Sequence, residues 1–200
     1  MPEAKIILRT IIHFIFCISG LVLIQEISTR IHQLPQACDW IWLLTCALFI
    51  PNSLKISKVQ LKWHNHHWVL LLTIFSTIPF LTIPSEETWR LSSIVIFLLN
   101  QLLGPAVCEE LYFRARFNQL TSNLKSPILL ALFNGILFSA AHIITRGFDL
   151  LTCLTFFPGV ILWIIYLKNK NLCTVILLHW LFNVSFYAVF YRFEIILPFF

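Results

Sequence analysis

Long apolar stretches dominate this chain of 200 residues and limit the folds that it can adopt. Apolar runs of about 20 residues, the length of helix that crosses the hydrocarbon core of a bilayer, recur along the whole sequence. Inside a bilayer the backbone must satisfy its own hydrogen bonds, which leaves α-helices and closed β-barrels as spanning structures. Barrel strands would show alternating hydrophobicity over roughly ten residues, and no such alternation occurs. The sequence therefore predicts an all-α fold, a polytopic bundle of membrane helices.

The composition agrees with this fold class and allows the spans to be placed. Hydrophobic residues make up 58% of the chain and charged residues 12%, whereas about 25% of a soluble domain is charged. We expect about seven transmembrane helices in one membrane domain over residues 1–200, with the polar residues of interest in a core over residues 90–190. The expected spans cover residues 6–27, 37–54, 67–84, 91–110, 127–145, 150–168 and 172–191.

The distribution of Lys and Arg predicts how the bundle is oriented. With seven spans, ten basic residues fall on the side of the N-terminus and four on the opposite side. Because cytoplasmic loops carry an excess of Lys and Arg, the N-terminus is expected to be cytoplasmic. The net charge of +5 thus lies in loops of a protein embedded in the lipid bilayer, and no basic surface for nucleic acid is expected.

Two adjacent carboxylates, Glu109 and Glu110, end the fourth apolar run and are followed by Arg114. A charge at the bilayer centre costs about 3 kcal/mol or more, so such charges usually mark function. Glu110 and Arg114 are four residues apart and can pair on one helical face. Glu109 points about 100° away and is left free to act as a base. The alternative is a charge cluster that simply marks the cytoplasmic end of a helix.

Two histidines and an asparagine lie in later apolar runs. His142 follows Phe138 by four residues, and Asn183 follows His179 by four, so each pair shares a helical face. Taken singly, such groups more often form hydrogen bonds between helices than catalyse reactions. If the fourth and fifth spans form a hairpin, Glu109 and His142 lie at similar depths. The polar groups can then converge on one site inside the membrane, although the sequence does not require it.

At these residues the chain resembles the CPBP intramembrane protease family, also called the CAAX protease and bacteriocin-processing (Abi) family. The family pattern is EExxxR, then FxxxH, then HxxxN on successive membrane helices, and the chain carries all three in order. The resemblance implies that Glu109 is a general base that activates water with help from His142. It also implies that His179 and Asn183 stabilise the oxyanion. The remaining motif residues would hold the geometry of the site: Glu110, Arg114 and Phe138.

The resemblance further implies a hydrolase, an intramembrane endopeptidase that cleaves a peptide or membrane-associated protein. The small size of the chain favours a bacterial member in the inner membrane. No cofactor is expected, because a water-activating glutamate needs no metal and the HExxH spacing is absent. The alternative is Zn²⁺ held by Glu109, His142 and His179, since two imidazoles and a carboxylate form a common zinc ligand set.

Two other functions are compatible with a chain of this kind. A membrane immunity or scaffold protein could keep the fold and act by binding alone, although a pure binder has no need for the complete set of motif residues. A proton-coupled transporter could use glutamates and histidines as a relay. Transporters usually contain two related halves, and this sequence contains no internal repeat. The endopeptidase is therefore the favoured interpretation.

Overall fold

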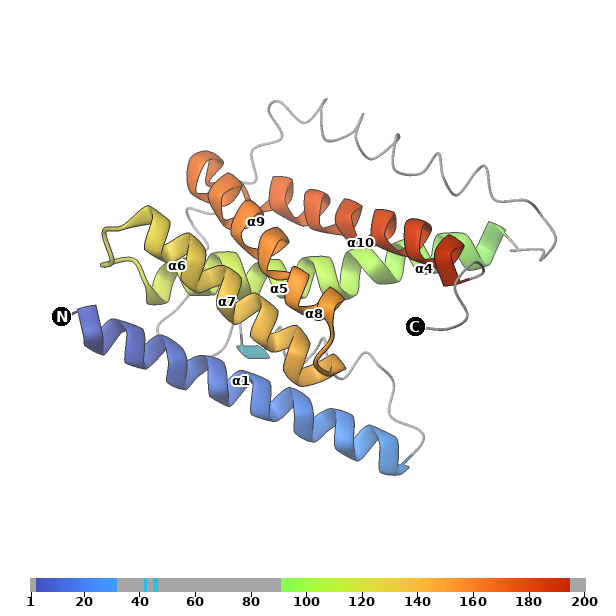
Figure 1. Cartoon of the computed structure of the whole chain (residues 1–200), viewed down its shortest axis with the longest axis horizontal. Helices are drawn as coiled ribbons and strands as arrows, with labels where there is room; N and C mark the ends of the chain where they lie inside the picture. The colour runs from blue at the N-terminus through green and yellow to red at the C-terminus, as the bar shows by residue number, and fades with distance from the viewer. Residues whose placement is uncertain (1–2, 32–41, 43–44, 47–90, 195–200) are drawn as a thin grey trace.

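A computed structural model gives the structure of the chain and describes residues 3–31, 42, 45–46 and 91–194 (Figure 1). Every regular element among these residues is a helix, which confirms the all-α prediction for the described part. The expected second and third spans, 37–54 and 67–84, lie outside the described residues except for residues 42, 45 and 46.

Helix α1, Glu3–Ile31, contains the expected first span and lies along one side of the bundle against α7 (Figure 1). One face of α1 is buried and includes Ile6 and Cys17. Apolar side chains such as Leu8 and Leu23 project from the opposite face and are exposed. A helix that is apolar on both faces suits a position between a protein core and lipid.

A rod of alternating α-helical and π-helical segments follows, and its middle carries the two glutamates. Pro105 lies inside the first π-helical segment. Proline donates no backbone hydrogen bond and its ring clashes with the carbonyl four residues earlier, so a wider turn accommodates it. Short π-helical turns inside α-helices often occur at functional sites. The segments are α4 (Leu91–Gln101), η2 (Leu102–Ala106), α5 (Val107–Glu110), η3 (Leu111–Arg116) and α6 (Phe117–Leu120).

Helix α7, Pro127–Arg146, coincides with the expected fifth span. Ser126 caps its start by accepting a hydrogen bond from the backbone N–H of Leu129 over 3.3 Å, and Pro127 occupies the first helical position, where no N–H is needed. The helix ends at Gly147, whose φ of 97° favours glycine. These local signals explain why the boundaries were predictable.

The last three helices complete the bundle. Helices α8 (Leu150–Leu154) and α9 (Phe156–Asn169), separated only by Thr155, together cover the expected sixth span, and Asp149 begins α8 with a capping box. Helix α10, Leu172–Glu194, contains the expected seventh span and runs beside α4 (Figure 1). Trp180 on α10 donates its indole N–H to the backbone carbonyl of Leu98 on α4 over 2.9 Å, which joins the two helices.

Helices α7 and α9 cross at two glycines. A Cβ atom on Gly159 would lie 3.0 Å from the Cα of Gly135, so the two backbones approach as closely as small residues allow. One turn further along α7, Ser139 donates a hydrogen bond over 3.2 Å to the carbonyl of Thr152 in α8. These contacts hold the C-terminal half of α7 in place.

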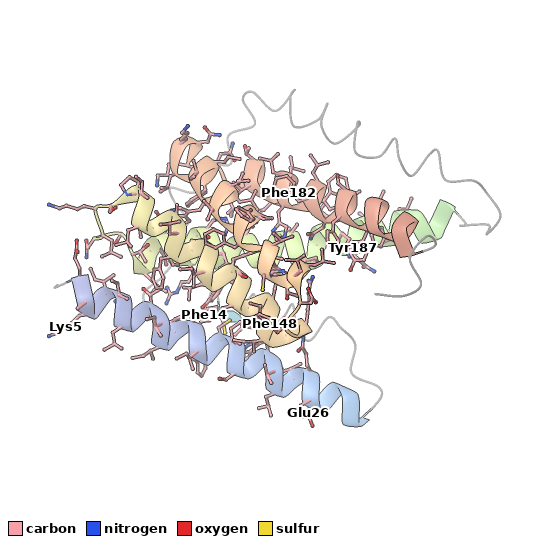
Figure 2. All side chains as sticks on the ribbon, viewed as in Figure 1. Lys5, Phe14, Glu26, Phe148, Phe182 and Tyr187 are labelled. Atoms are coloured by element: carbon pink, nitrogen blue, oxygen red, sulfur yellow. The ribbon has the colours of Figure 1, made fainter. Side chains whose placement is uncertain are left out.

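Three helical stretches of the described chain are long and apolar enough to cross a membrane: Glu3–Ile27, Pro127–Arg146 and Leu150–Asn169. Leu172–Tyr187 is apolar but shorter. Large apolar side chains project outward from the bundle, and Phe148, in the turn between α7 and α8, is 84% exposed (Figure 2). This surface is expected of a multi-pass membrane protein, whose outer side chains contact lipid.

Candidate active site

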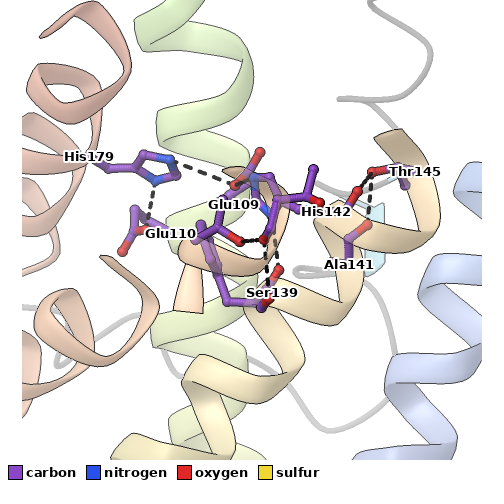
Figure 3. A network of polar contacts seen from close by, with 10 residues as sticks. Glu109, Glu110, Ser139, Ala141, His142, Thr145 and His179 are labelled. Atoms are coloured by element: carbon purple, nitrogen blue, oxygen red, sulfur yellow. Dashed lines mark hydrogen bonds and ion pairs between the residues drawn. The ribbon is translucent and has the colours of Figure 1, made fainter. Parts of the chain in front are cut away.

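Three helices bring acidic and imidazole side chains together inside the bundle (Figure 3). Helix α5 supplies Glu109 and Glu110, α7 supplies His142 and α10 supplies His179. Each of these four residues is 8% exposed or less. The cluster therefore lies within the protein rather than on its lipid-facing surface.

Glu110 is completely buried, and each of its carboxylate oxygens has a cationic or hydrogen-bonding partner. Arg114 Nε lies 2.9 Å from Oε2, an ion pair whose angle is too bent for a hydrogen bond. His179 Nδ1 donates to Oε1 over 2.8 Å. The pairing expected from the four-residue spacing thus forms, and it places Glu110 between the arginine of its own helix and the histidine of α10.

Glu109 is buried differently, because its Oε2 has no hydrogen-bond partner among the described residues. The nearest cation-forming atoms are His179 Nε2 at 3.7 Å and His142 Nε2 at 4.0 Å. Both separations are too long for a direct hydrogen bond. Polar atoms at such distances are suited to sharing a bridging atom between them.

The partners of the two histidines determine which ring nitrogen carries the proton. His142 Nδ1 lies 2.9 Å from the backbone carbonyl of Phe138, and a carbonyl only accepts, so Nδ1 holds the proton. His179 Nδ1 holds its proton for the same reason, since it faces the Glu110 carboxylate. In the neutral form both rings therefore direct an unprotonated Nε2 toward Glu109.

The apolar ring of Phe138 packs against the residues of this cluster. Its ring is 1% exposed, and its centroid lies 4.7 Å from the His142 ring and 5.7 Å from the His179 ring. The guanidinium carbon of Arg114 lies 5.4 Å from the same centroid, within the range of a cation–π interaction. One buried phenylalanine thus contacts residues of all three motifs and limits the movement of both imidazoles.

Asn134 belongs to the same polar network, and the sequence motifs did not identify it. It lies on α7, is completely buried, and accepts a hydrogen bond from Arg114 Nη1 over 2.8 Å. Its Nδ2 donates to the backbone carbonyl of Phe113 over 2.7 Å. The available signal was an asparagine within an apolar span, a polar group that must find partners inside the membrane.

Asn183 has no hydrogen bond to the cluster among the described residues. It is half-buried on α10, one turn beyond His179, and its side chain makes no hydrogen bond within the described residues. The predicted four-residue spacing places it on the helical face of His179.

The geometry of the cluster bears on the zinc alternative. Ligand atoms about 2.05 Å from a tetrahedral zinc ion are about 3.3 Å apart, closer than the separations of 3.7 and 4.0 Å found here. A water oxygen about 2.8 Å from each atom fits these separations with angles of roughly 80–90°. In the described part of the chain, no group of three or more His, Cys, Asp or Glu side chains is placed to hold a metal ion.

Comparison with known proteins relates the segment that contains this cluster to a known family. The family model of type II CAAX prenyl endopeptidases, Rce1-like, matches residues 90–185. No curated protein and no solved structure matches the chain. The matched segment extends from the start of α4 into α10 and contains all the clustered residues described above. Residues 90–185 therefore carry a domain of the Rce1-like type II CAAX prenyl endopeptidase family.

Proposed function

We propose that this protein is an intramembrane endopeptidase that hydrolyses a peptide bond of a peptide or membrane-associated protein. The observation that carries the proposal is the buried Oε2 of Glu109, which lacks a hydrogen-bond partner among the described residues and faces two imidazole Nε2 atoms. Membership of an endopeptidase family supports hydrolysis as the reaction. A carboxylate in this position can hold a water molecule and accept its proton.

In this mechanism Glu109 is the general base. A water molecule donates one hydrogen bond to Glu109 Oε2 and the other to His142 Nε2, whose lone pair is free because Nδ1 is bonded to Phe138. The water oxygen attacks the carbonyl carbon of the substrate as its proton moves to Glu109. The same proton then passes to the amide nitrogen as the C–N bond breaks, which leaves Glu109 ready for another cycle.

His179 and Asn183 stabilise the oxyanion that this attack creates. Because the proton of neutral His179 lies on Nδ1, where it is donated to Glu110 in a hydrogen bond, Nε2 can donate a hydrogen bond only when the ring carries a second proton. The charged ring then balances the two glutamates together with Arg114, so the cluster as a whole is neutral. The amide of Asn183 supplies a second donor, and one such donor contributes about 3–4 kcal/mol to transition-state stabilisation.

The protein acts as a single membrane domain with seven spans and a cytoplasmic N-terminus. The support for this topology is the uneven distribution of Lys and Arg among the loops that seven spans create. The substrate is a peptide or protein that reaches the site from within the bilayer or from its surface.

The test uses the full-length protein reconstituted in vesicles with a fluorogenic peptide ending in a CAAX sequence, with and without a farnesyl group. Glu109→Gln and His142→Ala should each lower kcat/KM by about 10²–10⁴-fold, the usual contribution of general base catalysis. His13→Gln is the matched control. His13 is a buried histidine on α1 whose ring forms a hydrogen bond with Tyr112 and not with the glutamates. Undiminished cleavage by the Glu109 variant would exclude this mechanism.

A broader search covers substrates other than CAAX peptides. Membrane proteomes from cells that express wild-type protein or the Glu109→Gln variant should differ in the C-termini or internal termini of the substrate. If a cellular phenotype of the wild-type protein persists fully in the variant and no terminus changes, the protein acts by binding, as an immunity or scaffold protein does.

A further inference from the structure

A chain of polar contacts leads from α7 to His179 without touching the proposed water site. It begins at Asn134, which bonds Arg114, and continues through the ion pair of Arg114 with Glu110. It ends where Glu110 accepts a hydrogen bond from the Nδ1–H group of His179. Asn134, Arg114 and Glu110 are all 0% exposed, so solvent cannot replace any of these contacts.

The chemistry of the two contacts fixes the orientation of the Asn134 amide. Phe113 offers a carbonyl, which only accepts, and Arg114 offers an N–H, which only donates. The amide must therefore place Nδ2 toward Phe113 and Oδ1 toward Arg114. An aspartate would lack the donor, a leucine would lack both groups, and either would leave a buried polar partner unsatisfied.

The contact with Phe113 also concerns the shape of the rod. Phe113 lies in the middle of η3, Leu111–Arg116, the π-helical segment that directly follows the glutamates. Asn134 thus donates a hydrogen bond to a backbone carbonyl of this π-helical turn. It also accepts a hydrogen bond from the guanidinium of Arg114, the next residue of the turn. One side chain of α7 therefore fixes both the backbone and the arginine of the segment on which Glu110 depends.

We propose that Asn134 is a positioning residue of the site: it holds Arg114 against Glu110 so that Glu110 keeps His179 aimed at the reacting atoms. The proposal rests on the proposed endopeptidase function for its kinetic consequences. Its structural content, the dependence of the His179 ring on Asn134, stands apart from any activity. A displacement of about 1 Å at a catalytic group can lower a rate about 10²-fold, which sets the size of the expected effect.

The experiment compares Asn134→Leu and Asn134→Ser in the full-length protein. Leucine keeps the branched shape and removes both polar groups, whereas serine is smaller but keeps one donor and one acceptor. Positioning predicts that kcat falls in the order wild type, serine, leucine, with the leucine variant lower by about 10–100-fold and KM within threefold. A space-filling role predicts the opposite order for the two variants. Leu130→Ala, a buried apolar truncation on the same helix, controls for general loss of stability.

A second measurement reports on His179 directly. In ¹⁵N-histidine NMR spectra of the protein in detergent micelles, Asn134→Leu should displace the His179 ring signals, which His179→Gln assigns. The His142 signals should stay in place, because its Nδ1 bonds Phe138 and not this chain of contacts. The Leu130→Ala control should leave both sets of signals unchanged.

The outcomes separate the two proposals. Unchanged His179 signals together with a kcat within threefold of wild type in Asn134→Leu would overturn the positioning role. If the wild-type protein cleaves no peptide, the proposed function fails, and the NMR comparison alone decides whether Asn134 positions His179. If the wild type cleaves but the leucine variant is as active as the serine variant or more so, Asn134 only fills space and the inference is wrong.

Discussion

Replacing Glu110 with glutamine tests whether the buried ion pair supports both stability and activity. The substitution Glu110→Gln keeps the shape of the side chain and removes its charge. Arg114 is completely buried and then has no anionic partner in contact with it among the described residues. Removing one partner of a buried ion pair usually costs more than removing both, because it leaves an uncompensated charge in the interior.

The magnitude follows from the geometry of the pair. At the observed 2.9 Å, two unit charges attract by about 6 kcal/mol for an effective dielectric constant of 20. Relaxation of the surrounding structure reduces the loss, and broken buried pairs typically cost about 3–5 kcal/mol. Arg114 retains its hydrogen bond to Asn134 in the variant. We therefore expect Glu110→Gln to lower the free energy of unfolding by about 3–4 kcal/mol.

The assay is reversible unfolding of the purified protein in mixed micelles with increasing amounts of a denaturing detergent. The double variant Glu110→Gln/Arg114→Met removes both charges and should regain at least half of the lost stability, since neutral replacements of buried pairs are often tolerated. Its peptidase activity should not return, because His179 still lacks its carboxylate partner. Unfolding of Glu110→Gln within 1 kcal/mol of wild type, or a double variant less stable than the single one, would refute the reasoning.

Three further predictions concern the helix crossing, Asn183 and metal dependence. Gly159→Leu should lower the free energy of unfolding by about 1–3 kcal/mol through overpacking, because its side chain meets the backbone of Gly135, and thermal unfolding would reveal this. Asn183→Ala should lower kcat by about 10²–10³-fold as an oxyanion donor is lost, yet unfold like wild type since its amide makes no hydrogen bond within the described residues. A zinc chelator should leave cleavage unchanged; loss of activity that added zinc restores would instead favour a metal held by Glu109 and the two histidines.

Much of the site could be predicted because its information is local in sequence. Two residues four apart on a helix share a face whatever surrounds them, so the pairing of Glu110 with Arg114 followed from spacing alone. The start of α7 was equally predictable from Ser126 and Pro127, which favour the first turn of a helix. Such signals do not depend on how the helices later assemble.

Other features depend on contacts between helices and left little trace in the sequence. Pro105 indicates the first π-helical segment, but no comparable residue marks η3. There the Phe113 carbonyl accepts a hydrogen bond from Asn134 of α7. The position of Asn134 in the network likewise follows from the crossing of α7 with the rod. The distance between Glu109 and the histidines also arises from assembly, and the sequence could show only that convergence was possible.

Because Glu109 and Glu110 are adjacent, one short helix provides both a general base and a carboxylate that holds Arg114 and His179. Two unpaired carboxylates at membrane depth would each bear a large desolvation cost, whereas two ion-paired carboxylates would leave no base. Because successive residues of a helix point in different directions, Glu110 reaches Arg114 and His179 Nδ1, while Glu109 Oε2 lies near the Nε2 atoms of the two histidines. If the two glutamates exchanged partners, the site would lose both its general base and the carboxylate that holds His179.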